Sequence, residues 1–117
     1  MKNIFFLVFM ISAFTAYGQK QVVSAYNANK AGKYADAATY IDEAITVEKA
    51  MAKEKTWRYR GEIYLNIAKD TALMAAFPQA LWTAKESYIK ARELDTKGNY
   101  EREIVTGLGL VQTTEIG

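Results

Sequence analysis

Side chains that could do chemistry are few in this chain of 117 residues, which contains neither cysteine nor histidine. Without a thiol or an imidazole, it can form no Cys or Ser-His nucleophile pair and no zinc site of the usual ligands. Paired acids, which general acid-base catalysis uses, occur at Asp42 and Glu43 and at Glu101 and Glu103. Adjacent helical residues point about 100° apart, and acids on charged helix faces are usually solvated. We therefore expect no catalytic residues, no metal site and no cofactor.

A cluster of basic residues is the second candidate for a site. It consists of Lys53, Lys55, Arg58 and Arg60. Glu54 and Glu62 interleave with it, and Glu54 stands four residues before Arg58, which is the spacing of a helical ion pair. This pattern favours the solvated start of a helix over an anion site. Gly107 and Gly109 lack a preceding strand and a third glycine, so they are not a phosphate loop.

The charge balance limits the classes of partner. Fifteen Lys and Arg against thirteen Asp and Glu give a net charge of +2, an imbalance too small to indicate nucleic-acid binding. Protein binding is the class of function that these observations favour. An enzyme would require a cofactor or an active site completed by another chain.

Residues 1–18 differ in composition from the rest of the chain. Lys2 precedes an apolar run at residues 4–14, and Ala16 and Gly18 supply the small residues of a signal-peptide cleavage site. The run is shorter than the roughly 20 residues that span a bilayer. We expect a signal peptide cleaved after Gly18, and hence export to the periplasm or cell envelope, or secretion, with no membrane span afterwards. An uncleaved anchor or a buried first helix is the alternative.

Helical periodicity runs through residues 19–117. Pro78 is the only proline, glycine is sparse before Gly98, and no stretch alternates with the period of a strand. Gly32 is expected to end the first helix and turn the chain. The spacing of apolar residues predicts helices at 19–31, 34–52, 54–69, 79–94 and 99–112, with a short helix at 71–77. The fold class is therefore expected to be all-α.

Two of the amphipathic stretches can be superposed by a shift of 47 residues. Small residues then fall on small ones and large residues on large ones, as expected for a repeat in which small side chains let two helices approach closely. The shift aligns Tyr34 with Leu81, Ala37 with Ala84, Ile41 with Tyr88, Ala44 with Ala91, and Val47 with Leu94.

With these residues the chain resembles the tetratricopeptide repeat (TPR) family. Trp57, Gly61 and Tyr64 have the spacing of the family's first-helix signature, and Ala84, Tyr88 and Ala91 match its second helix. An earlier unit matches less well, and an insertion near residues 68–79 separates the two helices of the better unit. The resemblance implies antiparallel helical hairpins stacked as a short right-handed superhelix.

The expected organisation is a signal peptide at residues 1–18 and a TPR-like helical repeat domain at residues 19–117. About two and a half repeats fit, where such arrays usually need about three and capping helices. We expect the domain to be part of a longer array; a partner that covers the open end is the alternative. The insertion is expected to form a local hydrophobic plug around Leu73, Met74 and Phe77 rather than a ligand pocket.

The resemblance also implies a groove lined by the first helix of each repeat, which would bind a peptide or a partner helix. The expected function is a non-catalytic protein-protein interaction scaffold. Each groove residue could equally be an ordinary exposed helix position, and self-association or docking into a larger envelope assembly is the alternative function. The groove positions are Tyr26, Asn29 and Lys30 in the first unit, and Lys55, Arg58, Glu62, Leu65 and Asn66 in the second.

Overall fold

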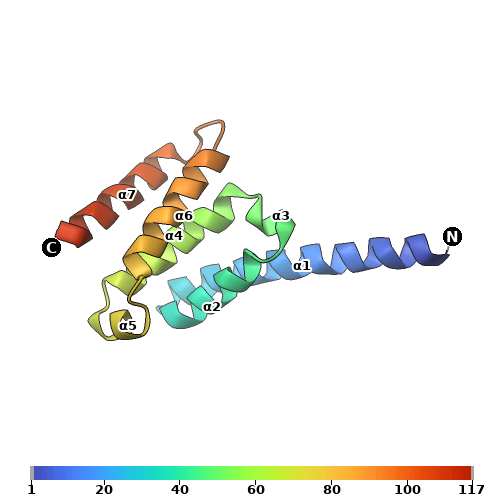
Figure 1. Ribbon diagram of the computed structural model, residues 1–117, viewed down its shortest axis with the longest axis horizontal. Helices are drawn as coiled ribbons and strands as arrows, with labels where there is room; N and C mark the ends of the chain where they lie inside the picture. Colours follow the sequence, from blue (N-terminus) through green and yellow to red (C-terminus); the bar gives the residue numbers. More distant parts are fainter. Residues whose placement is uncertain (1, 117) are drawn as a thin grey trace.

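A computed structural model describes the backbone of residues 2–116 and the side chains of residues 16–115. Every regular element in this part of the chain is a helix, which confirms the all-α prediction. Figure 1 shows their arrangement. The helices are α1 (Lys2–Lys30), α2 (Tyr34–Ala44), α3 (Glu48–Met51), α4 (Glu54–Ala68), α5 (Thr71–Ala76), α6 (Ala80–Leu94) and α7 (Glu101–Ile116).

The long helices form a stack of antiparallel hairpins, as predicted. The first hairpin is α1 with α2 and the second is α4 with α6, and these two pairs make the most extensive helix contacts. Between units, α2 packs against α4 and α6 packs against α7. The first helix of each unit also contacts the first helix of the next, because α1 touches α4 and α4 touches α7.

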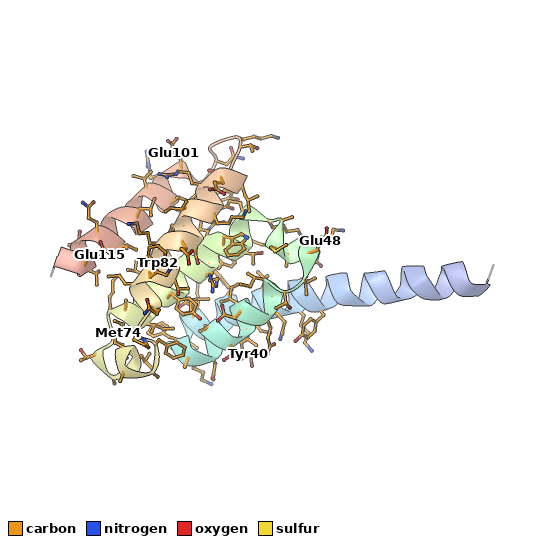
Figure 2. All side chains as sticks on the ribbon, in the orientation of Figure 1. Tyr40, Glu48, Met74, Trp82, Glu101 and Glu115 are labelled. Carbon is orange, nitrogen blue, oxygen red and sulfur yellow. The ribbon has the colours of Figure 1, made fainter. Side chains whose placement is uncertain are left out.

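Buried alanines explain how closely the helices approach. Ala37 and Ala44 of α2 and their counterparts Ala84 and Ala91 of α6 are all fully buried, which confirms that the 47-residue shift places small residues on small ones. Large aliphatic side chains fill the space beside them, and the core extends through all the long helices (Figure 2). Ile41, Ile63, Ile67 and Ile104 are the largest of these.

The chain reverses at two glycines with left-handed backbone conformation. Gly32 has φ of 78° between α1 and α2, and Gly98 has φ of 69° in the connection from α6 to α7. Side chains other than glycine rarely adopt this conformation. The prediction that Gly32 ends the first helix and turns the chain is confirmed.

The predicted helix at 34–52 is wrong, because the structure divides it. α2 ends at Ala44, Val47 has an extended backbone (φ −98°, ψ 118°), and α3 begins at Glu48. The break brings Val47 and Ala50 against α1, where a Cβ built on Gly18 would lie 2.9 Å from Val47 Cγ1. Packing against α1 therefore accounts for the interruption of the helical pattern.

The first helix is longer than predicted. α1 begins at Lys2 rather than near residue 19, and its amino-terminal half extends away from the other helices (Figure 1). The expected cleavage point lies inside a packed segment, where Gly18 is buried and Tyr17 and Gln21 both donate hydrogen bonds to Glu43. The side chains of residues 1–15, most of the predicted signal peptide, lie outside the described residues. Among the described residues, no helix has the length and hydropathy needed to cross a membrane.

The insertion near residues 68–79 forms α5, as predicted. The Asp70 carboxylate accepts hydrogen bonds from the backbone amides of Ala72 and Leu73 and so caps the helix. Phe77 packs edge-on against Tyr64 at 6.2 Å between ring centroids, while Leu73 and Met74 are partly buried against the core; Met74 is labelled in Figure 2. The segment is a hydrophobic plug that closes one end of the second hairpin.

Candidate functional site

A groove of about 480 Å³ lies between α4 and α7. Four of the predicted groove residues, Arg58, Glu62, Leu65 and Asn66, line its α4 side, and Lys69 extends this wall beyond the end of α4. The opposite wall comes from α7 and consists of Arg102, Glu103, Thr106, Gly107 and Leu110. Helix α7, which follows α1 and α4 as the first helix of a third unit, thus supplies half of the groove.

Tyr88 of α6 forms the floor of this groove. A Cβ built on Gly61 would lie 2.8 Å from Tyr88 Cδ2, and one built on Gly107 would lie 2.3 Å from Tyr88 Cζ. Two helices can therefore close on one aromatic ring only because each presents a glycine to it. Burial raises the pKa of the Tyr88 hydroxyl above its ordinary value, so the group stays protonated in alkaline solution as well as at neutral pH.

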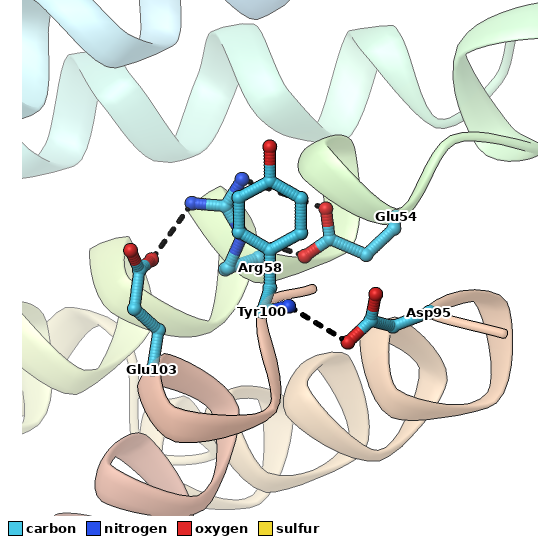
Figure 3. Close-up of polar contacts among 5 residues, drawn as sticks. All are labelled: Glu54, Arg58, Asp95, Tyr100 and Glu103. Atoms are coloured by element: carbon cyan, nitrogen blue, oxygen red, sulfur yellow. Dashed lines mark hydrogen bonds and ion pairs between the residues drawn. The ribbon is translucent and has the colours of Figure 1, made fainter. Parts of the chain in front are cut away.

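Arg58 holds the two walls of the groove together. Its Nε donates to Glu54 Oε1 at 2.6 Å within α4, and its Nη1 donates to Glu103 Oε2 of α7 at 2.9 Å (Figure 3). The guanidinium also stacks on the Tyr100 ring, with 4.1 Å from Cζ to the ring centroid. Tyr100 is fixed in turn, because its backbone amide donates to Asp95 Oδ2 at 3.0 Å. Arg58 is therefore an internal clamp between α4 and α7.

The polar groups left for a partner are those outside this clamp. Glu62 and Arg102 are exposed, and so is Lys69, which follows α4. Among the described residues, none of the three takes part in an ion pair. Leu65 is only 3% exposed and belongs mainly to the core. The groove thus combines a buried apolar and aromatic floor with charges of both signs at its edge.

The first-unit residues lie next to the same surface but interact mainly with one another and with α4. The Tyr26 ring lies 5.1 Å from the Tyr59 ring, and Lys30 Nζ lies 5.2 Å from the Tyr26 centroid. Contact with Tyr26 raises the pKa of the Lys30 ammonium. Asn66 Nδ2 donates to Asn29 Oδ1 at 2.9 Å. These contacts join α1 to α4.

Lys55 stands apart from the other predicted residues. It lines a different pocket, between α1 and the amino end of α4, together with Val22 and Lys53. The prediction treated Lys55 and Arg58 as parts of one continuous surface. The structure places them in separate pockets, because Arg58 turns toward α7.

The acid pairs face different partners. Asp42 accepts from Arg60 Nε at 2.8 Å and from the Tyr64 hydroxyl, whereas its neighbour Glu43 accepts from Tyr17. Glu103 binds Arg58, and Glu101 is exposed at the start of α7. The two carboxylates of each pair therefore have different surroundings. Asp42, Glu43 and Glu103 each bind another side chain, and Glu101 faces solvent. Among the described residues, no group of three or more carboxylates has the geometry to hold a metal ion.

Sequence reasoning missed the α7 wall and Tyr59. A shift of 46 residues maps Gly61 onto Gly107, so the glycine spacing was the signal that could have identified α7 as a wall of the groove. Tyr59 and Tyr100 carry no such signal, because their positions depend on how Arg58 packs between the helices.

Comparisons of the chain with protein-family models, with curated proteins and with solved structures found no match.

Proposed function

We propose that this protein is a non-catalytic interaction scaffold of the tetratricopeptide type that binds a peptide or a partner helix in the groove between α4 and α7. The observation that carries the proposal is the groove itself, which has a buried Tyr88 floor and, at its edge, charges of both signs that form no ion pair with any residue the structure describes. Extended or helical segments bind well in such places, because an apolar anchor supplies area while edge charges select the partner and its orientation.

The repeated arrangement of the helices supports the same function. First helix α1 contacts α4, and α4 contacts α7, while second helices α2 and α6 pack against them, so the same arrangement recurs along the stack. Stacked helical repeats bind partners on surfaces of this kind.

A peptide-display library selected on the immobilised full chain tests the proposal. We expect selected peptides to combine an aromatic or aliphatic anchor with charged residues, and to lose affinity about tenfold when the edge charges are reversed by Glu62→Lys with Lys69→Glu. The double change conserves net charge, and both residues are exposed, so the fold should be retained.

Lys97→Glu with Asp36→Lys is the matched control, because both residues are exposed and lie outside the groove. Peptides that bind both double variants and the unmodified chain equally would contradict the groove assignment. Circular dichroism would verify that helicity is unchanged in each variant.

We further propose that residues 1–18 direct export to the periplasm or cell envelope. The charged start, the short apolar run and the small residues before position 19 support this. Fusion of residues 1–25 to a phosphatase that is active only outside the cytoplasm should give activity in a bacterial host, and mass spectrometry should find Gln19 at the new amino terminus. An inactive fusion would refute export.

A second candidate function is self-association through the outer side of α7. Val105 is 52% exposed there, and nothing lies within 4 Å of a Cβ built on Gly109. Light scattering of the full chain would test it. A dimer that becomes monomeric on Val105→Asp would support self-association, and a monomer at all concentrations would refute it.

A further inference from the structure

Cleavage after Gly18, as proposed above for export, would make Gln19 the first residue of the mature chain. The side chains of Gln19 and Lys20 are exposed. The next residue anchors α1 to the fold, because Gln21 is buried and donates a hydrogen bond to Glu43. The new amino terminus would therefore lie on the surface of the folded protein, with its first side chain free to react.

A glutamine at an amino terminus carries its own electrophile. The neutral α-amino nitrogen can attack Cδ of the side-chain carboxamide and close a lactam ring. The new bond from the nitrogen to Cδ replaces the bond from Cδ to Nε2, and the side-chain nitrogen leaves as ammonia with a proton taken from the amine. No oxidant, reductant or second substrate is needed. The product is a pyroglutamyl residue, in which the nitrogen is an uncharged amide.

The surroundings of Gln19 favour this reaction. Gln19 lines a pocket of about 310 Å³ together with the exposed Lys53 and Lys55, and none of the described residues that line it is acidic. Glu54, which stands between the two lysines in the sequence, pairs with Arg58. Like charges disfavour the ammonium form of an amine, so the lysines increase the fraction of neutral amine, which is the nucleophile.

The other side of this pocket suits the product. It is aliphatic and consists of Val22, Val23 and Ala50. A lactam ring has methylene groups and no charge, so it can lie beside these side chains without the desolvation cost that an ammonium group would meet there. Loss of the charge is also favourable because the amine would stand at the start of a helix, where positive charge is destabilising.

We propose that Gln19 cyclises after export, with Lys53 and Lys55 promoting the reaction, and that the mature chain begins with a pyroglutamyl residue. The modification rests on the export proposed above, because it requires cleavage after Gly18. A chain that begins in this way has no free α-amino group and no terminal positive charge.

Mass spectrometry of the exported protein tests the proposal. The full chain is produced in a bacterial host, recovered from outside the cytoplasm and sampled at intervals in mildly alkaline buffer. We expect fragment ions that begin at residue 19 and lose about 17 Da, the mass of ammonia, until conversion is complete. A chain that begins at Gln19 and keeps its full mass would overturn the proposal and leave export intact. A chain that begins at another residue would also overturn it, and the phosphatase fusion would then decide export separately.

Matched variants make the test specific. Gln19→Ala keeps the free amine but has no carboxamide, so its first residue should lose no ammonia. Lys53→Gln with Lys55→Gln should slow lactam formation about twofold to threefold, because the amine is then more often protonated. Lys33→Gln with Lys97→Gln removes the same charge at exposed positions outside the pocket and should leave the rate unchanged. Equal rates in the two double variants would overturn the promotion by the pocket lysines.

Discussion

Replacing Gly107 by alanine should lower the free energy of unfolding, although alanine is the better helix former. Gly107 and Gly109 are two residues apart in α7, and the contacts around them differ completely. A Cβ at position 107 would lie 2.3 Å from Cζ of Tyr88, whereas a Cβ at position 109 would meet nothing within 4 Å. The two positions therefore separate helix propensity from packing within a single helix.

The expected magnitudes follow from these contacts. At position 109, alanine should raise the free energy of unfolding by about 1 kcal/mol through helix propensity alone. At position 107 the same gain is opposed by overpacking, which typically costs about 1–3 kcal/mol. The upper end applies, because the overlap is deep and Tyr88 cannot retreat toward α4, where Gly61 already touches the ring. The net loss should be about 2 kcal/mol, and the two variants should differ by about 3 kcal/mol.

Urea denaturation followed by circular dichroism would measure these free energies, and hydrogen exchange would show whether α7 loosens first. A double-mutant cycle adds a control, since Tyr88→Leu makes room for the new methyl group and should reduce the penalty of Gly107→Ala. If Gly107→Ala proves as stable as Gly109→Ala, the close packing of α7 on Tyr88 is wrong.

Three other predictions concern single contacts. Arg58→Met should increase hydrogen exchange throughout α7 and lower stability by about 1–3 kcal/mol, because it breaks the link between α4 and α7; unchanged exchange would argue against the clamp. Asp70→Ala should cost about 1 kcal/mol, measured by thermal unfolding, whereas Asp70→Asn should cost less, since Asn also caps helices. Burial raises the pKa of Tyr64 above the value of about 10 that it has in the unfolded state. The neutral side chain therefore stabilises the fold while the pH is below about 10, and this contribution is lost as the pH rises further. Urea midpoints should therefore fall between about pH 9 and about pH 11, and less so in Tyr64→Phe.

The parts of the fold that sequence could predict are those set by local periodicity. The small-on-small alignment of Ala37 with Ala84 and of Ala44 with Ala91 identified the faces on which helices meet, and all four residues are fully buried. Gly32 marked a turn, because a left-handed backbone favours glycine. Signals of this kind depend only on neighbouring residues in the chain, so they can be recognised without knowledge of the tertiary structure.

The parts that sequence could not predict depend on contacts between distant residues. The helical pattern continues through residues 34–52, yet the chain breaks at Val47 because this side chain packs on Gly18 of α1. In the same way, Arg58 occupies a groove position by spacing, but Glu103 and Tyr100, both more than forty residues further along the chain, take up its guanidinium. Spacing predicts the face on which a side chain lies and not the partner it finds.

The internal role of Arg58 decides how partner binding must be tested. A change at Arg58 would separate α4 from α7 and so distort both walls of the groove, and a loss of binding would then say nothing about direct contact. Glu62 and Lys69 lie on the edge of the same groove without ion pairs among the described residues. Reversing these two charges alters what a partner meets while leaving the clamp intact. Any effect on affinity can then be assigned to the groove surface, because the helices that form it have not moved.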